Sequence, residues 1–95
     1  MPRYIVERTI PGAAKLSEQQ LTAIAKKSVG AIKQMGSDYQ WHHSYVAGDK
    51  FYCVHEAPSE QAVREHARLG GFPIDRIEEI VEVVGPSGVK ALSPA

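Results

Sequence analysis

The sequence is poor in the features that assign a chain to a class at once. Its single cysteine, Cys53, excludes a disulfide within the chain. No apolar run approaches the roughly 18 residues of a membrane-spanning helix, so we expect no membrane partner. The segment from Met1 to Tyr4 enters a strand-like pattern at once, without the apolar core of a signal peptide. We therefore expect a cytoplasmic protein in which Cys53 stays reduced.

Neither sign of charge is in excess. Eleven basic and eleven acidic residues cancel in a chain of 95 residues. Proteins that bind nucleic acid usually carry a basic face. The densest basic patch here, Lys26, Lys27 and Lys33, is interleaved with alanine and glutamine and is typical of a solvated helix face. Nucleic acid is therefore not an expected partner. The motifs CxxC, HExxH and GxGxxG are absent, and no organic cofactor is expected.

The hydrophobic pattern predicts a single domain of alternating strands and helices. Its order is a strand over 3–10, a helix opened by the capping box of Ser17 and Gln20 and closed by Gly36, a hairpin over 39–56, a helix from Ser59 to Gly70, and a strand over 77–84. This order predicts an α+β, ferredoxin-like βαββαβ sandwich with both helices on one sheet face. The domain covers 1–85, and a short C-terminal extension, 86–95, holds a possible extra strand. The bare sheet face would favour a homodimer.

The hairpin gathers most of the ligand-capable side chains. It contains three of the four histidines, the only cysteine and the only tryptophan. A two-residue turn at Gly48-Asp49 suits the backbone of a tight hairpin. It would place His42 opposite His55 and Ser44 opposite Cys53, with directly opposed Cβ atoms about 5 Å apart.

Alternation along the strands places the remaining side chains of the hairpin on its other face. These are Trp41, His43, Tyr45, Tyr52, Val54 and Glu56. A three-residue turn would shift the register by one residue and place His43 opposite His55 instead.

Imidazole and thiolate groups suit nickel, zinc and copper. His42, Cys53 and His55 on one face would form an open metal site, completed by water, a small molecule or a second subunit. The alternative is that the histidines are polar residues on a solvated face.

His66 is predicted to point inward, because its spacing from Ala62 and Val63 places it on the apolar face of the second helix. A buried histidine needs a hydrogen-bond partner. It is therefore either a core residue bonded to a backbone carbonyl or a tyrosine hydroxyl, or a ligand or general base.

The chain resembles a bacterial domain-of-unknown-function family of small, actinobacterial-type nickel-binding proteins. The resemblance covers Met1 to about Gly85, and its segments are Tyr4–Arg8 with Pro11-Gly12, Gln40–Val46, Asp49–Val54 and Arg64–Ala67 leading to Gly71–Pro73.

This resemblance implies a dimeric ferredoxin-like subunit that binds nickel and serves in metal sequestration. It also implies His43, Cys53 and His66 as the ligand-capable set, whereas strand pairing favours His42 and His55. All five are therefore candidate metal ligands.

Two functions compete. The first is metal binding without turnover. The second is a cofactor-independent enzyme of the monooxygenase, isomerase or cyclase type, with His66 as general base. A pocket of about 300 Å³ or more lined by Trp41, His43, Tyr45 and His66 would favour the enzyme. Histidines on the outside would favour metal binding.

Overall fold

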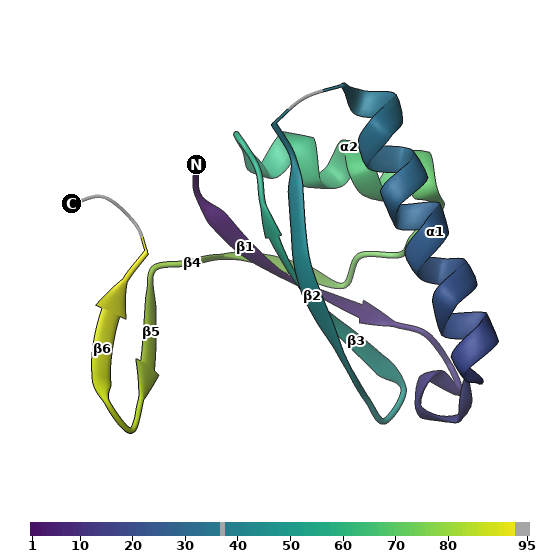
Figure 1. Cartoon of the computed structure of the whole chain (residues 1–95), viewed down its shortest axis with the longest axis horizontal. Helices are drawn as coiled ribbons and strands as arrows, with labels where there is room; N and C mark the ends of the chain where they lie inside the picture. The colour runs from purple at the N-terminus through teal and green to yellow at the C-terminus, as the bar shows by residue number, and fades with distance from the viewer. Residues whose placement is uncertain (37, 93–95) are drawn as a thin grey trace.

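The computed structural model describes residues 1–36 and 38–92 and is shown in Figure 1. Its elements are the strands β1 (Arg3–Thr9), β2 (Gln40–Ala47), β3 (Lys50–Glu56), β4 (Arg76–Ile80), β5 (Glu82–Gly85) and β6 (Gly88–Ala91), the helices α1 (Glu18–Met35) and α2 (Glu60–Gly70), and the 3-10 turn η1 (Ala13–Lys15). The protein is therefore α+β, with the predicted order of its first six main elements.

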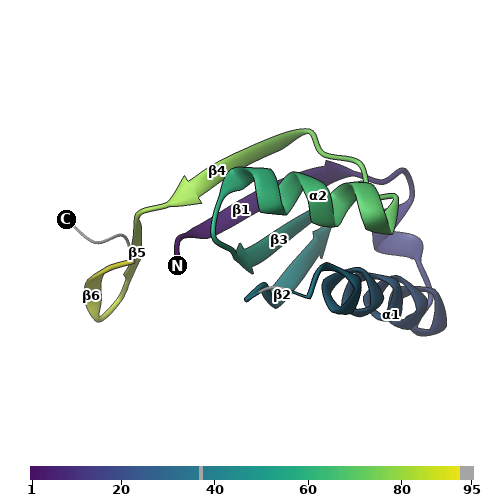
Figure 2. The same cartoon turned by 90° about the horizontal axis from the view of Figure 1, so that it is seen from above.

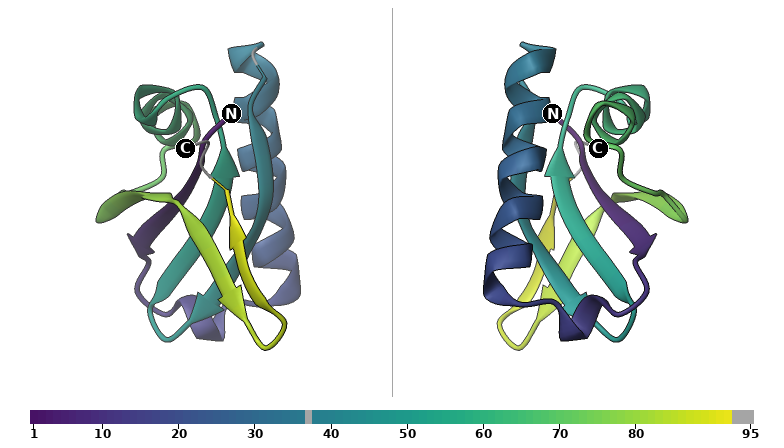
Figure 3. Two further views of the ribbon diagram at one scale, coloured as in Figure 1. Left: turned by 90° about the vertical axis from the view of Figure 1, so that its left-hand side faces the viewer. Right: turned by 90° about the vertical axis from the view of Figure 1, so that its right-hand side faces the viewer.

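Four strands form an antiparallel sheet in the order β2-β3-β1-β4. Both helices cover one face of it, with α1 near the β2 edge (Figures 2 and 3). None of the helices described is long and apolar enough to cross a membrane.

The helix boundaries follow the predicted capping signals. The Ser17 hydroxyl accepts a hydrogen bond from the Gln20 backbone N–H, and the Gln20 side chain accepts one from the Ser17 N–H. Gly36 ends α1 in a left-handed conformation with φ of 63°, which glycine adopts without steric cost. The hydroxyl of Ser59 caps α2 by accepting a hydrogen bond from the Ala62 backbone N–H.

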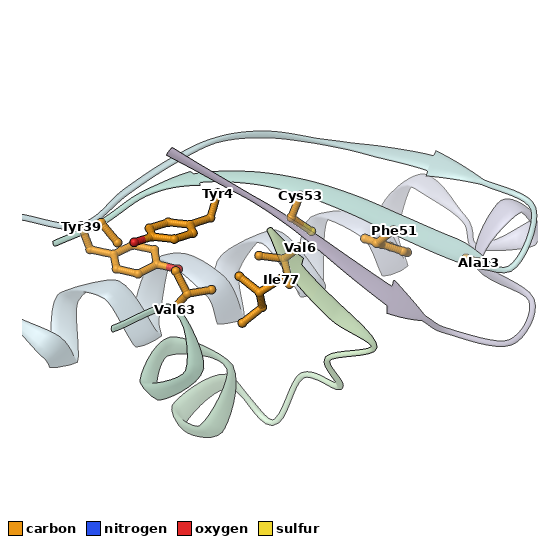
Figure 4. Close-up of a cluster of buried hydrophobic side chains, with 9 residues drawn as sticks. Tyr4, Val6, Ala13, Tyr39, Phe51, Cys53, Val63 and Ile77 are labelled. Atoms are coloured by element: carbon orange, nitrogen blue, oxygen red, sulfur yellow. The ribbon is translucent and has the colours of Figure 1, made fainter. Parts of the chain in front are cut away.

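The core lies between the sheet and the helices (Figure 4). Val6 of β1 and Val63 of α2 are fully buried in it. Strand alternation selects the inward side chains: β1 buries Tyr4, Val6 and Arg8, and β3 buries Phe51, Cys53 and His55.

The β2–β3 turn has the predicted length, but the register changes along the hairpin. Ala47 pairs with Lys50 and Ser44 pairs with Cys53, as a two-residue turn requires. A β-bulge between Trp41 and His43 then shifts the register.

The prediction that His42 lies opposite His55 is therefore wrong. Trp41 pairs with His55, and His42 is the extra residue of the bulge. The prediction that Trp41 shares a face with His43 and Tyr45 is wrong for the same reason, because two residues separate the inward side chains of Trp41 and Ser44 instead of one.

The strand predicted over 77–84 is divided in two. β4 ends at Ile80, and β5 pairs with β6 in a separate two-stranded sheet. This hairpin projects from the end of β4, away from both helices (Figures 1 and 2). The extra strand considered for the extension 86–95 is present as β6, next to β5 and outside the main sheet.

Candidate functional site

The bulge divides the five candidate ligands between the two faces of the sheet. His42 and His43 lie on the outer face. Cys53, His55 and His66 lie on the inner face, where they line one cavity with the helices. The structure thus brings three candidates together and separates them from the other two.

On the outer face, His42 and Glu56 form a close pair. His42 Nε2 lies 2.9 Å from Glu56 Oε1, and Arg3 Nε donates to the same oxygen at 3.3 Å. The hydrogen bond to His42, and to a smaller extent the contact with Arg3, lower the pKa of the Glu56 carboxyl. This side chain is therefore anionic at neutral pH. The ring of His43 packs edge-on against Tyr45 with centroids 5.0 Å apart.

On the inner face, three elements bring together a buried polar cluster. His66 Nε2 of α2 lies 3.0 Å from the Ser28 Oγ of α1. The His55 ring of β3 lies 5.1 Å from the His66 ring, and Tyr39 stacks on His66 with centroids 5.0 Å apart. His66 is inward, as its spacing predicts, but its partner is a serine hydroxyl and not a carbonyl or tyrosine hydroxyl.

Burial keeps both inner histidines neutral. It is the main reason why the pKa of His55 is lowered to about 3 and that of His66 to about 4. The neighbouring His66 and the charge of Arg8 contribute to the shift at His55, and Arg8 contributes to the shift at His66. Burial also raises the pKa of Tyr39, so its hydroxyl stays protonated. Each imidazole therefore carries one N–H donor and one acceptor nitrogen.

Several of these polar atoms are buried without hydrogen bonds. Within residues 1–36 and 38–92, both ring nitrogens of His55, Nδ1 of His66 and the Tyr39 hydroxyl find no partner. Burying such a group unpaired costs about 1–3 kcal/mol. His55 and His66 line the cavity described below, so a ligand bound there could supply the hydrogen bonds that their ring nitrogens lack.

Sequence reasoning missed Arg8. Its side chain is only 3% exposed and lines the cavity. Nη1 donates to the Pro73 carbonyl at 2.8 Å, and the guanidinium lies 5.4 Å from the centroid of the Phe72 ring. The signal was its alternation with Tyr4 and Val6, which places Arg8 on the inner face of β1.

The cavity has a volume of about 240 Å³ and lies between α1 and the sheet. Its walls are mostly apolar and come from Ile10, Leu21, Ile24, Ala25, Trp41, Val46, Phe51 and Phe72. Of the four residues expected to line an enzyme pocket, Trp41 and His66 do so, whereas His43 and Tyr45 lie on the outer face. The Phe72 wall depends on Gly70, because a Cβ there would lie 2.3 Å from Phe72 Cε2.

In the described part of the chain, no group of three or more histidine, cysteine, aspartate or glutamate side chains is placed to hold one metal ion. His42 with Glu56 is a two-donor set. A complete metal site would therefore need water or a second molecule to supply further ligands.

Comparison with known proteins assigns the chain to a family of small α+β proteins. Residues 4–80 match the family described as nickel responsive protein SCO4226-like, and the chain belongs to this family. The crystal structure of SCO4226 from Streptomyces coelicolor A3(2) is similar, with a TM-score of 0.69 and 20% identity over 82% of this chain and 94% of that chain. No curated protein matches.

The neutral inner histidines predict a loss of stability in acid. In the unfolded chain they bind protons below about pH 6.5, whereas in the folded protein they resist protonation down to about pH 4 and 3. The contribution of these two neutral histidines to the free energy of unfolding is therefore fully present above about pH 6.5 and is lost as the pH falls toward 4. At pH about 4.5 each histidine should lower the free energy of unfolding by about 2–3 kcal/mol.

Urea denaturation of wild type, His55→Phe and His66→Phe between pH 7.5 and about 4.5 measures this effect. Each variant should lose part of the pH dependence, and the exposed control His43→Phe should keep all of it. An unchanged pH dependence in His55→Phe would contradict the assignment.

Proposed function

We propose that the protein binds nickel, or another divalent transition metal, at the outer face of the sheet and serves in metal sequestration without turnover. The family supports a metal-related role. The observation that carries the proposal is the pair of His42 Nε2 and Glu56 Oε1, 2.9 Å apart at the bulge.

The separation and chemistry of these donors suit one shared ion. Two ligand atoms at adjacent corners of a coordination shell with bonds of about 2.1 Å are about 3 Å apart. The imidazole of His42 and the anionic carboxylate of Glu56 are both ligands that such ions accept. His43, the next residue of the bulge, is on the same face and is a further candidate.

The inner cavity is less suited to a dication. Its donors, the two neutral histidines and Cys53, lie in a cavity that also holds the buried guanidinium of Arg8. A divalent cation would be repelled by this fixed positive charge in a medium of low dielectric constant. This supports assigning the metal to the outer face.

We also infer that a second copy of the chain covers the outer face and completes the metal site. The element and strand order support a ferredoxin-like subunit. On its outer face Ile5 is 37% and Tyr45 61% exposed, and Val84 of the projecting hairpin is 73% exposed. A continuous exposed apolar patch is typical of an interaction surface, and an isolated two-stranded hairpin is only marginally stable, so a second copy that covers both would stabilise them. Cytoplasmic location stays a prediction.

Removing either donor of the outer pair should weaken nickel binding by about tenfold or more, because one ligand alone holds the ion poorly. Calorimetric titration of protein made without an affinity tag measures this for His42→Ala and Glu56→Gln. The double variant should lose little more than either single one, since the two groups share an ion. Strict additivity would contradict a shared site.

One control and one further test variant complete this titration. Glu78→Gln removes an exposed carboxylate of β4 and should leave nickel affinity unchanged. Deletion of His42 removes the ligand together with the bulge, and the regular ladder that results keeps Trp41 opposite His55. Wild-type nickel affinity in the deletion variant would contradict the proposal.

Nickel affinity should also fall steeply between pH 7.5 and 5.5. Only neutral imidazole coordinates a metal, and an ordinary histidine has a pKa of about 6.5. The same calorimetric titration at both pH values tests this. Equal affinities would indicate that carboxylates alone hold the ion.

Light scattering should give about twice the chain mass of 10.4 kDa at micromolar concentration. Tyr45→Asp introduces a charge into the proposed interface and should shift the protein toward the monomer. The matched control Glu65→Gln on α2 should not, because it lies on the opposite side of the subunit. A wild-type monomer would contradict the inferred dimer.

A further inference from the structure

The cavity beneath α1 has a combination of features that the metal-binding proposal does not use. It holds two buried histidines with unpaired nitrogens and one buried arginine within largely apolar walls. Small-molecule sites have this composition, an apolar cavity with a few convergent polar groups that fix orientation.

The volume limits the ligand to a single ring with a short substituent. At about 240 Å³ the cavity is slightly below the usual range of about 300–1,000 Å³ for ligand pockets. An apolar cavity of about 150 Å³ is enough to hold benzene. The aromatic walls of Trp41, Phe51 and Phe72 suit a flat ring, because offset and edge-on contacts with aromatic side chains add to its burial.

The charge of the cavity selects an anion. Among the residues that the structure describes, no carboxylate forms an ion pair with Arg8, although its side chain is only 3% exposed. A buried cation without a counter-ion is costly, and an incoming anion relieves that cost. Lys27 adds a second positive charge nearby, with its Nζ 5.8 Å from the centroid of the Phe72 ring.

The two histidines supply the remaining polar contacts. His55 and His66 are each 1% exposed, and three of their four ring nitrogens have no partner within the described ranges. As neutral imidazoles they offer both donors and acceptors. An oxygen-bearing ligand head can therefore bond to them as well as to the guanidinium.

We propose that this cavity is a binding site for a small aromatic carboxylate, with the carboxylate paired to Arg8, the ring against the apolar walls, and His55 and His66 hydrogen-bonded to its polar head. The site is separate from the proposed metal site, since the two lie on opposite faces of the sheet. Neither a metal nor a reaction is needed for this binding.

The test uses benzoate and its uncharged isostere benzamide as probes. Trp41 is the only tryptophan of the chain and lines the cavity, so its fluorescence reports binding, with calorimetry as the second measurement. In tag-free wild-type protein with chelator present, benzoate should bind saturably and about tenfold more tightly than benzamide, as expected when an ion pair distinguishes them.

Two cavity variants test the role of the Arg8 charge and the role of the cavity volume separately. Arg8→Met keeps the aliphatic stem and removes the charge, so it should bind benzoate and benzamide equally. Ala25→Phe fills the cavity from α1 and should abolish the binding of both probes; it is informative even if Arg8→Met does not fold. The control Arg64→Met removes an exposed arginine of α2 that pairs with Glu60 and should behave as wild type.

Three results would overturn the proposal: no saturable benzoate binding, equal affinities for the two probes in wild type, or binding unaffected by Ala25→Phe. The His42 deletion variant should bind benzoate normally although it has lost nickel. This variant therefore distinguishes failure of the cavity proposal from failure of the metal proposal.

Discussion

The β-bulge at His42 determines which side chains can act together in this protein. A regular ladder continued from Ser44 and Cys53 would have placed His42 beside His55 on the inner face. The extra residue instead keeps Trp41 inward, where its indole N–H donates to the Ser44 hydroxyl at 3.0 Å. Both neighbouring histidines then lie on the outer face. Bulges commonly redirect side chains in this way at the ends of paired strands, and here the result is a separate set of polar groups on each face.

The inner set consists of groups whose burial has an electrostatic cost. Two imidazoles remain neutral because the cavity disfavours a charge on them, and the guanidinium of Arg8 adds to that effect. The guanidinium itself is stabilised in part by the Pro73 carbonyl and by the Phe72 ring. These contacts position the charge without neutralising it. The polar cluster is thus held in place by the fold while its hydrogen-bonding capacity remains largely unused.

Much of the fold followed from local signals, whereas the site did so only in part. Capping residues fixed the ends of α1 and α2, and the Gly48-Asp49 turn fixed the register from Ala47 to Ser44. The turn could not reveal the bulge, because a turn sets the register only as far as the ladder stays regular. The inward place of Trp41, in a cavity that residues of α1 also line, is a tertiary feature. His66 was correctly placed inward, since helical spacing alone determines its face.

Arg8 was missed for a physical reason of the same kind. A charged residue in an alternating strand is ordinarily assigned to the solvated face, and only the burial of Tyr4 and Val6 beside it indicates otherwise. Its ring partner, Phe72, is brought near it by the close packing of that ring on Gly70. No rule of spacing relates residues this far apart in the chain. Tertiary packing therefore brought Phe72 to Arg8, and the local sequence pattern indicates only that Arg8 lies on the inner face of β1.

The two faces of the sheet thus favour ligands of opposite charge, a cation on the outer face and an anion on the inner face. On the outer face the anionic Glu56 lies against His42, and solvent or a second subunit can supply the remaining ligands of a cation. On the inner face the cavity is lined by the charged guanidinium of Arg8 and by imidazoles that are neutral. Coulombic interactions are screened by water on the exposed side and much less so within the cavity. The outer face therefore needs several ligands to hold an ion, whereas one buried guanidinium is enough to select the charge of what enters the cavity.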